Sequence, residues 1–105
     1  MDKKNIIEFK LKNFKKSASR DFPISNMYFF GSRAVGKPHR YSDIDLIIVS
    51  PKFRKLDFFE RGALMYDYWN FDYPVDFLCY TPEEFNKLKK QITIVREAVR
   101  EGIEI

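Results

Sequence analysis

The spacing of apolar residues predicts a helix at the start of the chain. Between residues 3 and 19, Ile7, Leu11, Phe14 and Ala18 recur every three or four positions, and lysines fill the positions between them. Apolar side chains at this spacing lie on one side of an α-helix. The segment therefore predicts an amphipathic helix.

Three apolar runs, at residues 27–30, 43–49 and 75–80, predict strands. The second half of the middle run is apolar on both faces, which is typical of a central strand covered on both sides. The first run ends at Gly31-Ser32, which indicates a tight turn, and Pro51 ends the second. Residues 33–42 are mostly polar and contain Gly36 and Pro38, so they predict a short helical turn followed by a loop.

Capping signals predict two further helix starts. Asp57 and Glu60 resemble a capping box, and Thr81, Pro82 and Glu84 combine an N-cap, a first-turn proline and the reciprocal capping residue. The first of these helices is expected to present one face with Phe59, Ala63 and Tyr66.

The end of the chain predicts a last helix and a possible edge strand. Residues 94–100 would present Val95, Ala98 and Val99, and Gly102 would end the helix. Residues 103–105 could then add a strand at the edge of the sheet. Because helices and strands alternate along the chain, the fold class is α/β (α+β), a small mixed β-sheet flanked by helices.

Length and composition limit the class of protein. A chain of 105 residues with 45% hydrophobic residues predicts one folded domain rather than a disordered segment. The longest aliphatic run has four residues, far short of the roughly 20 that a membrane span needs. No apolar signal-peptide core is present, and the single cysteine, Cys79, predicts a buried core thiol. These features predict a cytoplasmic protein.

Charge and aromatic content indicate possible binding surfaces. The net charge of +4 would attract nucleic acid, nucleotides or an acidic protein surface. Six lysines crowd the first segment, which favours a solvated helix face and leaves a binding surface as the alternative: Lys3, Lys4, Lys10, Lys12, Lys15 and Lys16. Seven aromatic residues exceed what a small core needs, so part of the group could form an exposed interface: Phe58, Phe59, Tyr66, Tyr68, Trp69, Phe71 and Tyr73.

Three aspartates and a glycine turn form the candidate site. Asp43 and Asp45 point to one face of their predicted strand, about 7 Å apart along the backbone. Asp45 precedes a buried run and Asp76 lies between Val75 and Phe77, so we expect both carboxylates to be costly unless a cation neutralises them. Oxygen ligands without histidine or cysteine indicate Mg²⁺ or Mn²⁺. Gly31 would let a triphosphate approach the backbone closely.

These motifs resemble a known family. Phe30-Gly31-Ser32-Arg33-Ala34 with Gly36, then Ser42-Asp43-Ile44-Asp45-Leu46, are similar to the signature of the DNA polymerase beta-type nucleotidyltransferase superfamily. The short length points to its minimal nucleotidyltransferase (MNT) branch. The segment from Val75 to Phe85 is similar to the third-carboxylate strand of that branch and the helix after it. The resemblance implies a nucleotidyltransferase fold and one minimal domain over residues 1–105.

The resemblance also implies roles for the site residues. Asp43 and Asp45 would bind two Mg²⁺ ions and the triphosphate of ATP, and Asp76 would activate the acceptor hydroxyl. Gly31, Ser32 and Arg33 would bind the nucleotide, with the hydroxyl and the guanidinium on its phosphates. One departure is Val35, where many minimal members carry arginine. Three basic residues lie close by in the sequence: Lys37, His39 and Arg40.

The function implied by the resemblance is transfer of AMP from ATP to a hydroxyl of a protein partner. In this branch the partner is commonly a helical HEPN-domain toxin, so the chain would be the antitoxin of a HEPN/MNT pair. Two alternatives stay open: a nucleotide-binding regulatory subunit that neutralises its partner by binding, and a basic nucleic-acid-binding module. The intact aspartates favour the enzyme, and the lack of stacking motifs weighs against nucleic acid. The sequence leaves open the base, the acceptor residue and homodimer formation.

Overall fold

The computed structural model describes residues 3–36 and 43–105. Its elements, in chain order, are α1 (Lys3–Ala18), β1 (Asn26–Phe30), β2 (Ile44–Val49), the 3₁₀ helix η1 (Pro51–Lys55), α2 (Phe58–Tyr66), β3 (Val75–Tyr80), α3 (Pro82–Leu88), α4 (Ile94–Glu101) and β4 (Ile103–Glu104). Within these described ranges, no helix is both long enough and apolar enough to cross a membrane.

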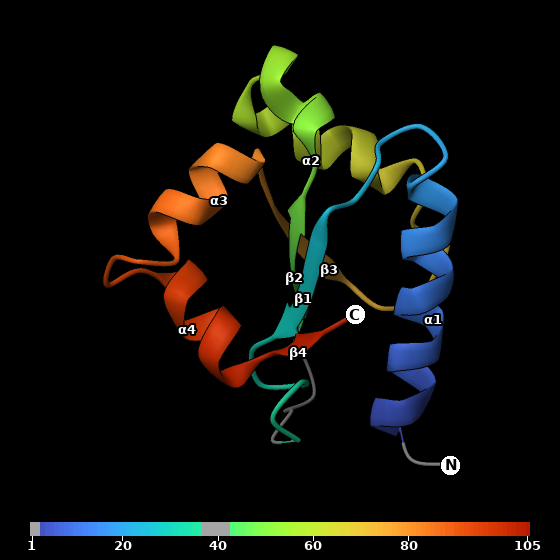
Figure 1. Cartoon of the computed structure of the whole chain (residues 1–105). Helices are drawn as coiled ribbons and strands as arrows, with labels where there is room; N and C mark the ends of the chain where they lie inside the picture. The colour runs from blue at the N-terminus through green and yellow to red at the C-terminus, as the bar shows by residue number, and fades with distance from the viewer. Residues whose placement is uncertain (1–2, 37–42) are drawn as a thin grey trace.

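The four strands form one mixed sheet in the order β3-β2-β1-β4. β2 runs parallel to β3, whereas β1 runs antiparallel to both β2 and β4. Figure 1 shows the sheet nearly edge-on, with α1 on one side and α3 and α4 on the other. Residues 46–49 of β2 are fully buried, as the prediction of a central strand requires. The mixed α/β fold class is therefore confirmed.

Each face of the sheet has its own apolar cluster. On the α1 side, the predicted helix stripe is buried with Phe29, Leu46 and Phe77: Ile7, Leu11, Phe14 and Ala18. On the other side, Ile47 and Val49 pack with residues of α3 and α4: Phe85, Val95 and Ala98. Because side chains of a strand alternate between faces, β1, β2 and β3 each contribute to both clusters.

The predicted helix boundaries agree with the capping contacts. The side chain of Thr81 accepts a hydrogen bond from Glu84 N, and Glu84 accepts one from Thr81 N, which completes the predicted capping box. Asp57 caps α2 by accepting from Glu60 N at 2.9 Å. α4 ends at Gly102, and β4 pairs with β1 as an edge strand. The helix η1 was not predicted; Pro51 ends the strand and also starts this turn.

The buried face of α2 differs from the apolar face that the sequence suggested. Phe59 is 85% exposed, and Ala63 and Tyr66 are exposed as well. The residues that α2 buries are Arg61 and Met65. Helical spacing identifies side chains that share a face, but the tertiary contacts decide which face is covered. Here a charged residue is buried because its hydrogen bonds are all made inside the fold.

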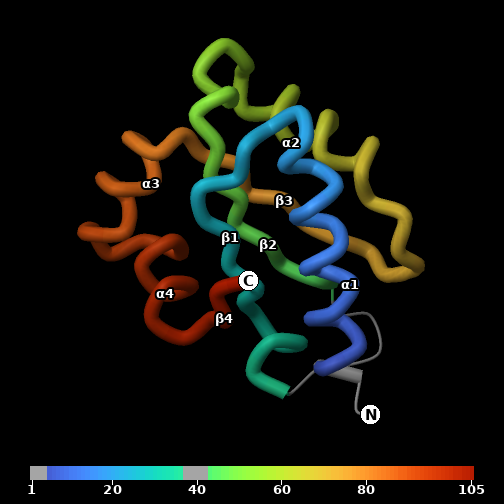
Figure 2. The backbone as a smooth tube through the Cα atoms, turned by 45° about the vertical axis from the view of Figure 1, so that its right-hand side comes forward, coloured from blue at the N-terminus to red at the C-terminus, as the bar shows by residue number. Residues whose placement is uncertain are grey.

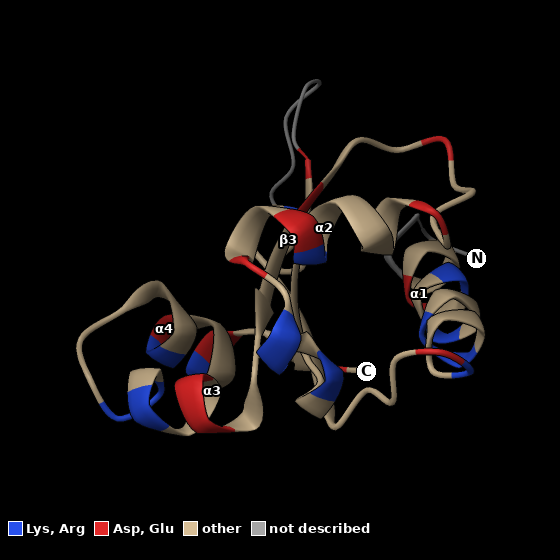
Figure 3. Cartoon of the chain, turned by 90° about the horizontal axis from the view of Figure 1, so that it is seen from above, with Lys and Arg blue, Asp and Glu red and all other residues tan. Residues whose placement is uncertain are grey.

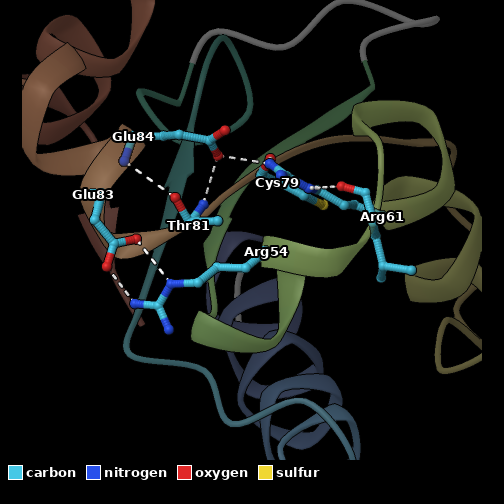
Figure 4. A network of polar contacts seen from close by, with 7 residues as sticks. Arg54, Arg61, Cys79, Thr81, Glu83 and Glu84 are labelled. Atoms are coloured by element: carbon cyan, nitrogen blue, oxygen red, sulfur yellow. Dashed lines mark hydrogen bonds and ion pairs between the residues drawn. The ribbon is translucent and has the colours of Figure 1, made fainter.

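Figure 4 shows how Arg61 is accommodated. Its guanidinium and Nε donate to the carbonyl oxygens of Leu56 and Cys79 at 3.1 and 3.2 Å, and to Glu84 Oε1 at 2.6 Å. A second ion pair, between Arg54 and Glu83, links η1 to α3 at the surface. These contacts join α2 to the end of β3 and the start of α3.

The seven aromatic residues and the lysines of α1 include both buried or half-buried and exposed side chains. Tyr68, Trp69, Phe71 and Tyr73 pack half-buried against the core, whereas Phe58, Phe59 and Tyr66 are exposed. Figure 3 shows basic residues along α1. Three lysines of this helix are exposed: Lys10, Lys12 and Lys16. Lys15 is partly buried, and its Nζ donates a hydrogen bond to the Ile105 carbonyl oxygen at 2.7 Å. The side chains of Lys3 and Lys4 lie outside the described ones.

Candidate functional site

A cavity of about 540 Å³ opens between one end of the sheet and α4. Figure 2 shows α4 running alongside β1, with β4 returning to it. The residues that line the cavity come from β1, the turn after it, β2, β3, α4 and the glycine after α4: Phe30, Gly31, Val35, Asp45, Asp76, Leu78, Ile94, Glu97, Ala98, Glu101 and Gly102. Three of the predicted site residues, Gly31, Asp45 and Asp76, are therefore brought together.

The pairing of β2 with β3 places two of the predicted carboxylates side by side. Asp45 and Asp76 are register partners in the parallel ladder, where neighbouring strands lie about 4.8 Å apart. Asp43 lies two residues before Asp45, immediately before β2 begins at Ile44. Burial raises the pKa of Asp45, and the charges of Asp76 and Asp43 raise it further. The three aspartates therefore share one electrostatic environment.

Gly31 fits this site for two reasons. Its φ of +84° lies in the left-handed region, which residues other than glycine rarely adopt. A Cβ atom at this position would also overlap the Oδ2 atom of Asp45. The turn is closed by Ala34 N and Val35 N, which both donate to the Gly31 carbonyl oxygen at 3.1 and 3.2 Å. The predicted tight turn is confirmed, and only glycine lets it pass so close to Asp45.

The exposure of Asp76 differs from the prediction. β3 is an edge strand of the sheet, and Asp76 is exposed on it. Asp43 is exposed too, while Asp45 is half-buried. The argument from the cost of burying a carboxylate therefore holds for Asp45 and is wrong for Asp76. An exposed carboxylate beside a cavity is instead accessible to a ligand.

Tyr66 of α2 holds the strand segment that carries Asp76. Its Oη donates to the carbonyl oxygen of Val75 at 2.7 Å, and its ring meets Phe77 edge-to-face with 5.0 Å between centroids. Both neighbours of Asp76 are thus fixed by one side chain. Tyr66 is therefore partly exposed and still packs against β3.

Ser32 and Arg33 follow Gly31 but do not line the cavity. The guanidinium carbon of Arg33 lies 4.7 Å from the centroid of the Tyr73 ring, which is a cation–π contact. Their predicted roles at the phosphates stay predictions. Lys37, His39 and Arg40, the nearby basic residues of the sequence, lie outside the described residues. Val35, which stands where arginine is common, is half-exposed at the cavity.

The carboxylates can be tested for their fit to a divalent cation. Within residues 3–36 and 43–105, no three aspartate, glutamate, histidine or cysteine side chains gather closely enough to form a ready-made metal site. Mg²⁺, however, keeps several waters and is usually held by one or two carboxylates together with substrate phosphates. Burial, and after it the charges of Asp76 and Asp43, raise the pKa of Asp45, and a bound cation would offset both effects. The donor set therefore fits Mg²⁺ or Mn²⁺ in its chemistry.

Sequence reasoning missed the α4 side of the cavity. Ile94, Glu97 and Glu101 line it, and none of them was predicted as a site residue. They lie three or four residues apart, so the sequence places them on one helical stripe. The sequence gives no signal of what this stripe faces, because that depends on how α4 lies against β1.

A small mixed sheet, with a glycine turn at one strand end and paired aspartates on neighbouring strands, defines the class of protein. Residues 11–100 match the family of nucleotidyltransferase domains, and the chain belongs to this family. The resemblance noted from the sequence motifs is thereby confirmed, and so is the nucleotidyltransferase fold.

One curated relative and one solved structure are similar to this chain, the second in fold alone. The chain is 34% identical over 86 residues to the "Probable protein adenylyltransferase MntA" of Haemophilus influenzae (strain ATCC 51907 / DSM 11121 / KW20 / Rd), which covers 78% of this chain and 74% of the relative. The fold of the present chain matches the crystal structure of a "putative nucleotidyltransferase" from Sulfolobus solfataricus with a TM-score of 0.54. That match has 24% identity and covers 83% of this chain and 82% of the other.

Proposed function

We propose that this protein transfers AMP from Mg-ATP to a hydroxyl group of a protein partner. The observation that carries the proposal is the register pairing of Asp45 with Asp76 at a cavity next to the Gly31 turn. Membership of the nucleotidyltransferase family supports the reaction class. The name of the Haemophilus relative, a protein adenylyltransferase, supports a protein as the acceptor.

On the nucleotide side, Gly31 leaves room for the triphosphate to approach the backbone, and Ser32 and Arg33 bind its phosphates. Asp43, Asp45 and Asp76 are the residues that would hold Mg²⁺, or Mn²⁺ in its place. When bound, the metal stabilises the charge that develops at phosphorus. Asp43 and Asp76 are electrostatic neighbours of Asp45, so the three aspartates together supply the negative charge that a divalent cation would neutralise.

On the acceptor side, Asp76 takes the proton of the incoming hydroxyl. The hydroxyl oxygen then forms a bond to the α-phosphorus of ATP, while the bond from this phosphorus to the oxygen that bridges it to the β-phosphorus breaks. Pyrophosphate leaves with the electron pair of the broken bond, and the proton passes from Asp76 to solvent. The exposure of Asp76 on an edge strand suits this role, because the acceptor must reach it from outside.

The acceptor in this proposal is a helical HEPN-type protein, and the chain acts as one domain, the antitoxin of a toxin–antitoxin pair. The MNT resemblance of the sequence and the name of the relative support this assignment. The exposed aromatic residues of α2 offer apolar area for a partner. We place the reaction in the cytoplasm, where a lone thiol such as Cys79 stays reduced.

A second candidate function is a nucleotide-binding regulatory subunit that neutralises its partner without transfer. One observation favours it: Val35 lines the cavity at a position where many minimal members carry arginine, so this residue supplies no positive charge to the phosphates during transfer. In that case ATP would bind, and the partner would be inhibited by complex formation alone.

Intact-mass measurement separates the two candidates. The protein is incubated with ATP, Mg²⁺ and the product of the adjacent gene, and the masses of both chains are recorded. A gain of one or more AMP units on the partner supports the enzyme. Asp43→Ala should abolish the gain, while Asp72→Asn, which removes an exposed carboxylate outside the cavity, should retain it. A tight complex with no mass gain favours the regulatory subunit.

A further inference from the structure

The wall of the cavity opposite the aspartates is one stripe of α4. Ile94, Glu97, Ala98 and Glu101 occupy positions i, i+3, i+4 and i+7 of this helix and all line the cavity. Gly102 allows the end of α4 to pack closely against β1, because a Cβ atom at this residue would overlap the carbonyl oxygens of Ala98 and Phe29. Ala98 is buried against the sheet, so the two glutamates are the charged groups that α4 presents to the cavity.

The charge of this cavity is opposite to the charge of the chain. The whole sequence carries a net charge of +4, yet the described lining residues include four carboxylates and no lysine or arginine. Glu97 and Glu101 form no ion pair with a cation in residues 3–36 and 43–105; the ion pairs there are Arg54–Glu83 and Arg61–Glu84. Arg96 and Arg100 line a neighbouring surface hollow together with both glutamates, but neither arginine forms an ion pair with them, so the negative charge of Glu97 and Glu101 is available to a ligand.

A nucleotide does not account for these two glutamates. In the proposed function, the metal ions and the triphosphate would bind on the side of the cavity that carries Asp45 and Asp76. Phosphates would be repelled by Glu97 and Glu101, since like charges placed together are costly. The α4 wall therefore suits a cationic group that enters the same cavity beside the nucleotide.

The rim of the cavity adds apolar contact area. Val35 and Ile94 line the cavity and are each 51% exposed. Ile92, two residues before Ile94, is 95% exposed. Lysine and arginine pack their aliphatic stems on apolar surface while the charged end reaches an acidic group. An apolar rim next to two unpaired glutamates has this arrangement.

We propose that the α4 wall is the acceptor-docking site, and that Glu97 and Glu101 are specificity-determining residues for a cationic protein segment. The segment carries lysine or arginine next to the hydroxyl that receives AMP. The inference rests on the proposed function and adds the charge of the acceptor. Glu97 and Glu101 act by binding the side chains next to the hydroxyl, not by proton transfer.

Three matched peptides test this charge preference. Each has a central tyrosine flanked on both sides by arginine, by glutamine or by glutamate. They are titrated into the ¹⁵N-labelled full chain with Mg²⁺ and an ATP analogue that has methylene between the α- and β-phosphorus. We expect the arginine peptide to shift the amides of residues 94–102 and to bind about tenfold more tightly than the glutamine peptide. The glutamate peptide should bind least.

Matched variants assign the effect to α4. E97Q/E101Q should remove most of the preference for arginine, whereas D67N/D72N, which removes two exposed carboxylates outside the cavity, should retain it. Equal binding of the arginine and glutamine peptides by the wild-type chain would overturn the proposal. So would a preference that survives E97Q/E101Q, or Mg²⁺ alone moving the Glu97 and Glu101 amides and displacing the arginine peptide.

The same titration separates this inference from the proposed function. Shifts of the Gly31 and Asp45 amides report binding of the ATP analogue. If the analogue fails to bind while the peptide order holds, the proposed transfer is wrong and the cation-binding surface stands. If the analogue binds and the peptide order fails, the α4 inference alone is wrong. The wild-type peptide series gives this answer even where E97Q/E101Q does not fold.

Discussion

The two ends of the parallel pair β2–β3 can be compared through one charged residue each. At the carboxyl end, Arg61 is 6% exposed and donates to Leu56, Cys79 and Glu84. At the amino end, Asp45 is half-buried, and the charges that act on it are those of two other carboxylates, Asp76 and Asp43. A buried charge whose hydrogen-bond partners lie on neighbouring elements holds those elements together. A half-buried charge among like charges instead destabilises the folded protein when no ligand is bound.

The pKa directions at the two ends express the same contrast. Burial tends to raise the pKa of Glu84, but hydrogen bonds from Arg61 and Thr81 outweigh it and lower the pKa overall. For Asp45, burial and the charges of Asp76 and Asp43 all raise the pKa. The charges at the carboxyl end are therefore compensated by partners within the chain, whereas the negative charge at the amino end can be compensated by a positively charged ligand. The comparison predicts that substitutions at the first end change stability and those at the second change function.

The largest expected effect is on catalysis. Asp76→Ala should lower AMP transfer by about 10²- to 10⁴-fold, because it removes the base that accepts the hydroxyl proton. Binding of ATP and the urea midpoint should change little, since Asp76 is exposed. Transfer rate, nucleotide affinity and urea unfolding are measured on one preparation. A loss of stability with unchanged transfer would reverse the assigned difference between the two ends.

The next effect is on stability. Arg61→Met should reduce the free energy of unfolding by about 2–3 kcal/mol, because the carbonyl oxygen of Cys79 and the carboxylate of Glu84 lose their donor. Urea unfolding measures the loss. Arg54→Met is the matched control: its ion pair with Glu83 is exposed, so it should cost much less. Equal losses in the two variants would show that the buried network adds nothing.

A smaller effect is expected on nucleotide binding. Ser32→Ala should weaken ATP binding by about 1–2 kcal/mol, the usual cost of one lost hydrogen bond to a charged group. Titration calorimetry with Mg-ATP measures it, and Ser25→Ala, at an exposed position before β1, is the control. Unchanged affinity would remove Ser32 from the phosphate site. The transfer rate at saturating ATP should stay close to that of the wild type, unlike the result for Asp76.

The smallest effect is a pH-dependent gain in stability. Because the pKa of Asp45 is raised in the folded chain, its ionised form destabilises the fold at neutral pH. That cost disappears as the pH falls through the folded pKa toward the ordinary value of 3.8. Asp45→Asn should therefore raise the melting temperature by a few degrees at pH 7 without metal, and the gain should vanish near pH 3.

Mg²⁺ and a control variant sharpen this last measurement. Mg²⁺ should raise the melting temperature of the wild type but not that of Asp45→Asn, and its effect on ATP affinity should be lost in the variant. Asp72→Asn, at an exposed position outside the cavity, should show no gain that depends on pH. Metal-independent ATP binding that is unaffected by Asp45→Asn would exclude the metal-binding role of this end.

Much of the fold follows from local rules that the sequence carries. The apolar stripe of α1, the capping box at Thr81 and the strand from Val75 to Tyr80 each depend on residues a few positions apart. These three predictions succeeded since backbone hydrogen bonding and side-chain alternation act over short separations. For the candidate site, the sequence offered Asp43, Asp45 and Asp76 with the turn at Gly31, and the structure brings Gly31, Asp45 and Asp76 to one cavity.

The tertiary structure decided what depends on distant neighbours. Arg61 is buried because Cys79 and Glu84, 18 and 23 residues away, accept its hydrogen bonds. Asp76 is exposed because β3 lies at the edge of the sheet, and Glu97 faces Asp45 across a cavity because α4 ends against β1. Exposure and pKa depend on the dielectric surroundings and charges that packing brings together, and no periodicity of the sequence encodes them.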